Sequence, residues 1–84
     1  MAPRRVDVLI FADFQLLDAA GPIAAFEIAG RLAPGAYDLR VVSTAPGWVK
    51  SSSGAALMAA PLDEAPLDTL LVSGGDGTRP ERLD

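Results

Sequence analysis

The chain has 84 residues, half of them apolar, and a formal net charge of −4. This length allows one domain at most, because α/β domains usually need roughly 100–200 residues. There is no cysteine and no histidine, which excludes disulfides, thiolate metal sites, a thiol nucleophile and the commonest general base near neutral pH. The seven basic residues are scattered along an acidic chain, which argues against a nucleic-acid surface in it.

No segment of the sequence is typical of a membrane span or a secretory leader. Unbroken apolar runs such as residues 8–12 are far too short to cross a bilayer. The start of the chain is basic, but Asp7 and Asp13 bracket the apolar run behind it, unlike the h-region of a signal peptide. We therefore expect a cytoplasmic protein that does not contact a membrane.

The first half of the chain predicts a βαβ unit. Residues 6–12 are short, apolar and rich in β-branched side chains, as in a parallel strand that is buried on both faces. Residues 13–15 form a turn, and residues 16–32 have helical character that ends before a Pro-Gly pair. Residues 37–43 follow as the second strand.

The second half predicts a hairpin and one further buried strand. Residues 48–52 and 55–59, separated by a Ser-Gly pair, are typical of a short hairpin. Residues 61–66 form a polar connection to a strand at 69–73, which runs into a glycine-rich loop at 74–77. The predicted fold class is α/β: the N-terminal portion of a flavodoxin-like doubly wound parallel sheet, consisting of βαβ, a β-hairpin and a strand.

Functional sites in open α/β sheets form beyond the carboxyl ends of the strands. Here those ends carry Asp13, then Ser43 and Thr44, and finally Gly74 with Gly75. Asp13 would lie at the rim of such a pocket, although a solvated turn residue is the simpler interpretation. Trp48 is expected to pack the hairpin or a subunit contact, and stacking on a ligand is the less favoured alternative.

Asp18 is the strongest candidate for a functional side chain. As a helix N-cap, it would accept hydrogen bonds from free backbone N–H groups. If the helix already includes it, the 100° step places Pro22 and Ala25 on its side, and Glu27 and Arg31 on the opposite, solvent side. The carboxylate then lies in a cleft or in a close contact. Both interpretations are open from the pattern alone.

The loop that contains Gly74, Gly75 and Asp76 could offer backbone N–H groups to an anion or a developing oxyanion. It does not match a dinucleotide fingerprint or a Walker loop. A tight turn after the strand, in which glycine supplies a positive φ, is the simpler explanation.

Together these segments resemble the ThiJ/PfpI, class I glutamine amidotransferase-like superfamily. The resemblance rests on the Leu-Asp-Ala-Ala-Gly-Pro string at 17–22 and on the strand that ends in Gly-Gly at 74–75. It covers about residues 6–79. It is closest to the amidotransferase-like N-terminal domains of AraC-type transcription regulators, and the isonitrile hydratases share the same opening.

The resemblance implies that residues 1–84 are the N-terminal, incomplete part of such a domain. In that family a cysteine on a nucleophile elbow follows the next strand, and Asp18 would be its acidic partner. Gly74, Gly75, Asp76 and Asp13 would line the pocket. The regulators also carry a helix–turn–helix DNA-binding region further along. Relatives often have proline where this chain has Ser73.

Three functional hypotheses follow. The preferred one is the ligand-sensing and dimerisation region of an AraC-type transcription regulator, with a homodimer and a small-molecule ligand as partners and DNA bound only by a C-terminal region. The alternative is a fragment of an isonitrile hydratase-like or other cysteine-dependent enzyme, whose nucleophile lies outside these residues. The third is a non-catalytic association module. We expect no cofactor, no metal and no cysteine-dependent catalysis by this chain alone.

Overall fold

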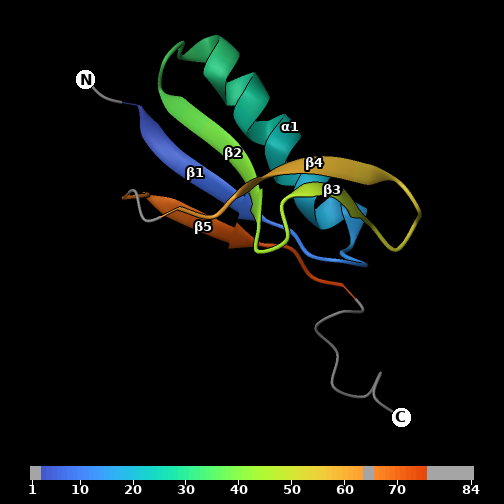
Figure 1. The fold of residues 1–84 in the computed structure, drawn as a ribbon. Helices are drawn as coiled ribbons and strands as arrows, with labels where there is room; N and C mark the ends of the chain where they lie inside the picture. The colour runs from blue at the N-terminus through green and yellow to red at the C-terminus, as the bar shows by residue number, and fades with distance from the viewer. Residues whose placement is uncertain (1–2, 64–65, 76–84) are drawn as a thin grey trace.

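The chain folds as one mixed sheet with a single helix in its described part. The computed structural model describes residues 3–63 and 66–75. Its elements are, in chain order, β1 (Arg4–Leu9), α1 (Leu16–Leu32), β2 (Tyr37–Ser43), β3 (Gly47–Lys50), β4 (Ala56–Pro61) and β5 (Thr69–Val72). Figure 1 shows α1 lying along one face of the sheet. The predicted α/β class is confirmed.

The five strands pair in the order β3-β4-β2-β1-β5. The central strand β1 pairs in parallel with β2 on one side and with β5 on the other. The predicted βαβ unit is therefore present. The predicted hairpin forms as the antiparallel pair β3 and β4, and β4 also joins the outer edge of β2 in parallel. All carboxyl ends of the parallel strands thus meet at one edge.

The helix and the second strand begin and end where the sequence predicts, but the first strand is shifted. β1 begins at Arg4, where the backbone N–H donates to the Ala36 carbonyl at 2.8 Å. It ends at Leu9, because the chain then turns, with the Phe14 N–H donating to the Phe11 carbonyl at 3.0 Å. Side-chain periodicity carries no information on either hydrogen bond.

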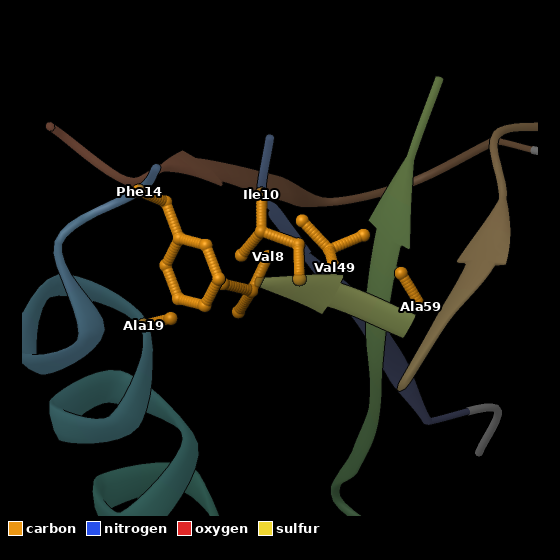
Figure 2. Packing of buried hydrophobic residues seen from close by; sticks show 6 residues of the cluster. All are labelled: Val8, Ile10, Phe14, Ala19, Val49 and Ala59. Carbon is orange, nitrogen blue, oxygen red and sulfur yellow. The ribbon is translucent and has the colours of Figure 1, made fainter. Parts of the chain in front are cut away.

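The hydrophobic core lies between the sheet and the start of α1. Figure 2 shows the Phe14 ring between Ala19 of α1 and Val8 of β1, with Ile10 beside them. Val49 of the hairpin closes the cluster on the far side, together with Ala59. Phe14 is fully buried although it lies in a turn. A loop residue therefore supplies the largest side chain of this core.

The helix presents apolar residues to solvent as well as to the sheet. Only Ala19 is fully buried in α1, whereas Leu17, Ile28 and Leu32 are 71%, 53% and 84% exposed. At 100° per residue these three lie within about 60° of one another around the helix axis. They form an outward stripe, here called the outer stripe of α1. A helix that is apolar on both sides is normally buried on both sides.

The sheet face opposite α1 also exposes apolar side chains on its edge strand. Leu71 packs against the core on the α1 side, so alternation places Leu70 and Val72 on the opposite face. They are 47% and 59% exposed, and no described helix covers them. Parallel sheets are normally covered on both faces.

A cluster of ion pairs occupies the same face at the amino end of β1. Arg5 donates two hydrogen bonds of 3.0 Å to the carboxylate of Asp7, which is 1% exposed. The Arg5 guanidinium also lies 2.9 Å from Asp63, which in turn pairs with Arg40 at 2.9 Å. The hydrogen bonds to Asp7 and then to Asp63 raise the pKa of Arg5 above its usual value. The buried carboxylate therefore always faces a charged partner.

We expect Arg5→Met to lower the free energy of unfolding by about 3 kcal/mol, because it leaves the Asp7 carboxylate buried without its guanidinium. The double variant Arg5→Met/Asp7→Leu should recover most of this loss. Urea denaturation followed by circular dichroism measures both. Arg31→Gln is the control, since its ion pair with Glu27 is exposed and should contribute less than about 0.5 kcal/mol. Equal losses for the Arg5 and Arg31 variants would contradict this account.

Candidate functional site

The loop between β1 and α1, residues 10–15, organises the carboxyl edge of the sheet. The Asp13 N–H donates to the Lys50 carbonyl at 2.9 Å, and the Ser52 N–H donates to the Phe14 carbonyl at 2.9 Å. On the other side, the Gln15 N–H donates to the Gly74 carbonyl at 2.7 Å. This loop therefore fixes both the hairpin and the segment after β5.

Asp13 adopts an unusual backbone conformation in that loop. Its φ is +64°, which makes it the single non-glycine residue with positive φ among those described. Aspartate tolerates this left-handed region better than most side chains. The residue is exposed. In the structure Asp13 is thus a solvated turn residue that sets the direction of the loop. Its place at a pocket rim stays a prediction.

The structure brings Asp18 and the glycine pair together. Asp18 lies in the first turn of α1, and its Oδ2 atom accepts a hydrogen bond of 2.9 Å from the Gly74 N–H. The N-cap interpretation is wrong, because Gln15 occupies that position without a side-chain cap. The predicted close contact is present, although Asp18 is exposed rather than enclosed in a cleft. Its role as the acidic partner of a cysteine stays a prediction.

The two glycines lie close to different parts of the chain, Gly75 to the backbone of the β1–α1 loop and Gly74 to the Asp18 side chain of α1. A Cβ on Gly75, whose φ is +148°, would lie 2.7 Å from the Asp13 carbonyl oxygen and 2.8 Å from the Gln15 nitrogen. A Cβ on Gly74 would lie 2.7 Å from Asp18 Oδ2. Since the Gly74 N–H already donates to Asp18, it can reach an anionic ligand only if that carboxylate moves. Asp76 lies outside the described residues.

Ser73 connects the end of β5 to β1 through both its backbone and its side chain. It is 2% exposed, and both its N–H and its hydroxyl donate to the Leu9 carbonyl, at 3.2 Å and 3.0 Å. Proline would remove the backbone donor. The serine therefore extends the pairing of β5 with β1 by one residue.

The sequence interpretation missed a small cavity on the hairpin side of the β1–α1 loop. It has a volume of about 180 Å³ and is lined by residues that include Phe11, Thr44, Trp48 and Lys50. Nothing in the spacing of these residues indicates a cavity, because it arises from the packing of β3 against the ends of β1 and β2. The apolar Phe14 in an otherwise polar turn was the one visible signal that this loop is packed.

Within residues 3–63 and 66–75, no three acidic side chains lie close enough together to hold a metal ion. In the same part of the chain, no helix is long and apolar enough to cross a membrane.

We expect Gly75→Ala to lower the free energy of unfolding by about 2–4 kcal/mol, because its Cβ would collide with backbone atoms and its φ is unfavourable for alanine. Gly30→Ala is the matched control. A Cβ there has open space within α1, so alanine should stabilise the protein by about 0.5–1 kcal/mol. Thermal and urea unfolding of both variants check these values, and a neutral Gly75→Ala would show that the loop does not hold the glycine as closely as described.

Comparison with known proteins gives a similarity at the level of structure. No family model matches the chain, and no curated protein matches it. The structure is similar to that of an AraC family transcriptional regulator from Pseudomonas putida, with a TM-score of 0.81 and 27% sequence identity. The similarity covers 96% of this chain and 56% of the regulator chain. The chain therefore resembles, over nearly its whole length, little more than half of a transcription regulator.

Proposed function

We propose that this chain is the N-terminal, ligand-sensing and dimerising region of an AraC-type transcription regulator with an amidotransferase-like domain of the ThiJ/PfpI kind. The observation that carries the proposal is the similarity to the Pseudomonas regulator over 96% of this chain. The resemblance of residues 17–22 and 74–75 to the same class of regulators supports it independently.

The uncovered sheet face supports the view that residues 1–84 are an incomplete domain. β5 is an edge strand whose Leu70 and Val72 remain 47% and 59% exposed. An apolar edge strand of a parallel sheet normally pairs with a further strand and packs under a further helix. The regulator chain extends well beyond the similar part, so it contains enough polypeptide for both.

The outer stripe of α1 supports self-association. Large apolar side chains on one exposed stripe mark an interaction surface more often than a solvated one. The stripe lies on the side of α1 away from the sheet, so completion of the opposite sheet face would not cover it. We assign it to a second copy of the chain, because most soluble oligomers are symmetric homodimers.

A specific observation keeps the enzyme alternative in view. Asp18 lies at the carboxyl edge and contacts Gly74 at the end of the last described strand. If a cysteine followed the next strand on a nucleophile elbow, its acidic partner would have to lie at this carboxyl edge, where Asp18 lies. An isonitrile hydratase-like enzyme is therefore the second candidate, and Asp18 would then be essential for turnover.

We expect the full-length gene product to bind a DNA fragment from upstream of its own gene with a Kd of about 10 nM or tighter at physiological salt. The 84-residue chain alone should not bind that fragment, because it lacks a clustered basic surface. Fluorescence anisotropy measures both. Asp18→Asn should leave DNA binding unchanged. Absence of DNA binding, combined with turnover of an isonitrile that Asp18→Asn abolishes, would favour the enzyme alternative.

We expect the chain to sediment as a dimer at micromolar concentration and Ile28→Lys to make it monomeric, because the charge lies in the middle of the outer stripe. Met58→Lys is the matched control, since Met58 on β4 is 54% exposed and Ile28 is 53% exposed. Sedimentation velocity measures the mass of each variant. A monomeric wild-type protein, or equal effects of both substitutions, would contradict the assignment of this surface.

A further inference from the structure

The cavity beside the β1–α1 loop lies where ligands of α/β sheets bind. Its walls come from Phe11 after β1, from Ser43 and Thr44 at the end of β2, and from Trp48 and Lys50 of β3. The carboxyl ends of two adjacent parallel strands thus open into it. It is separate from the Asp18–Gly74 contact, which involves the segment after β5 on the other side of the loop.

The size of the cavity matches one ring. A cavity of about 150 Å³ is enough to bind benzene in a protein interior. The volume here is about 180 Å³, which leaves room for one six-membered ring with a small substituent. Pockets for larger, drug-sized ligands measure roughly 300–1,000 Å³.

The indole ring of Trp48 does not pack in the hydrophobic core. Trp48 is 72% exposed and is absent from the buried cluster, to which its neighbour Val49 belongs. An exposed indole offers a flat apolar surface on which another ring can stack. The wall of the cavity therefore favours a planar, aromatic or unsaturated ring over an extended aliphatic chain.

The polar groups of the wall favour a negative substituent. Lys50 is the only lysine of the chain, and no carboxylate in residues 3–63 and 66–75 forms an ion pair with it. By contrast, Arg5, Arg31 and Arg40 are all paired. Lys50 is exposed and is one of the residues that line the cavity, and its Cε lies 3.9 Å from the position of a Cβ on Gly54.

Ser43 adds a buried donor at the base of the cavity. The residue is 1% exposed, and its Oγ atom accepts the Ala45 N–H at 3.2 Å. No described acceptor takes the hydroxyl proton. A hydroxyl group can accept and donate at the same time, so this proton is available to an acceptor that enters the cavity.

From these observations we infer that the cavity binds a small ring carboxylate, with the ring on Trp48 and the carboxylate facing Lys50. This inference rests on the proposed function, because it names the class of ligand that the sensing region would bind. Binding itself depends only on residues of this chain.

The experiment uses 4-fluorobenzoate and its uncharged counterpart 4-fluorobenzamide as probes, observed by fluorine NMR with the full-length gene product. We expect the benzoate to bind and the benzamide to bind at least fivefold more weakly. Lys50→Gln should weaken the benzoate about fivefold and leave the benzamide unchanged. Trp48→Leu should weaken both probes about tenfold. Arg4→Gln, an exposed cation at the opposite end of β1, is the control and should change neither affinity.

Equal binding of the two probes, or benzoate binding that survives both the Lys50 and the Trp48 substitutions, would overturn the inference. DNA binding by the same protein separates the two proposals. DNA binding without benzoate binding would refute the ligand class and leave the regulator in place. Benzoate binding without DNA binding would support the cavity and refute the regulator.

Discussion

The backbone hydrogen bonds of the β1–α1 loop are the constraint on which the rest of the structure depends. Asp13, Phe14 and Gln15 form hydrogen bonds that join the hairpin and the segment after β5 to the end of β1, although these segments lie far apart in sequence. The Phe14 side chain fills the core from the same loop. Backbone polar groups next to a buried side chain such as Phe14 must be paired, and here the paired donors and acceptors hold the neighbouring segments in place. The carboxyl edge is therefore a single packed unit, although its parts come from the whole length of the chain.

This constraint explains why glycine and aspartate occur where they do. Gly75 approaches the loop backbone so closely that any side chain would collide with it, and Gly74 leaves just enough room for the Asp18 carboxylate. The positive φ of Asp13 turns the chain back toward the hairpin. The Asp18 carboxylate accepts the hydrogen bond of the Gly74 N–H. The observed role of the glycine pair is therefore structural. A ligand that uses this N–H group must first displace a carboxylate.

The sequence predicted the elements well because their signals are local. Helix 16–32 was predicted from its helical character and from the Pro-Gly pair behind it. Strand 37–43 was predicted as the segment that follows, and both are found with the predicted bounds. For Asp18 the sequence predicted a cleft or a close contact without naming a partner, and the structure supplies that partner as the Gly74 N–H. The shift of β1, the docking of β4 onto β2 and the Phe14 contacts could not be predicted, because each depends on pairing between distant segments. The cavity was missed for the same reason, since the spacing of its lining residues carries no pattern.

The loop also connects the cavity with the contact between Asp18 and Gly74. On one side, the Asp13 N–H is held by the Lys50 carbonyl; on the other, the Gln15 N–H is held by the Gly74 carbonyl. A ligand carboxylate beside Lys50 would act on β3. A displacement of Gly74 would alter its hydrogen bond with Asp18 at the start of α1. Coupling between two sites needs a contiguous element with differential contacts at both ends. Residues 13–15 form the contiguous element here. The helix α1 follows directly after them and contains the outer stripe of Leu17, Ile28 and Leu32. The geometry thus links the cavity to the outer stripe of α1 through one buried aromatic residue and its backbone.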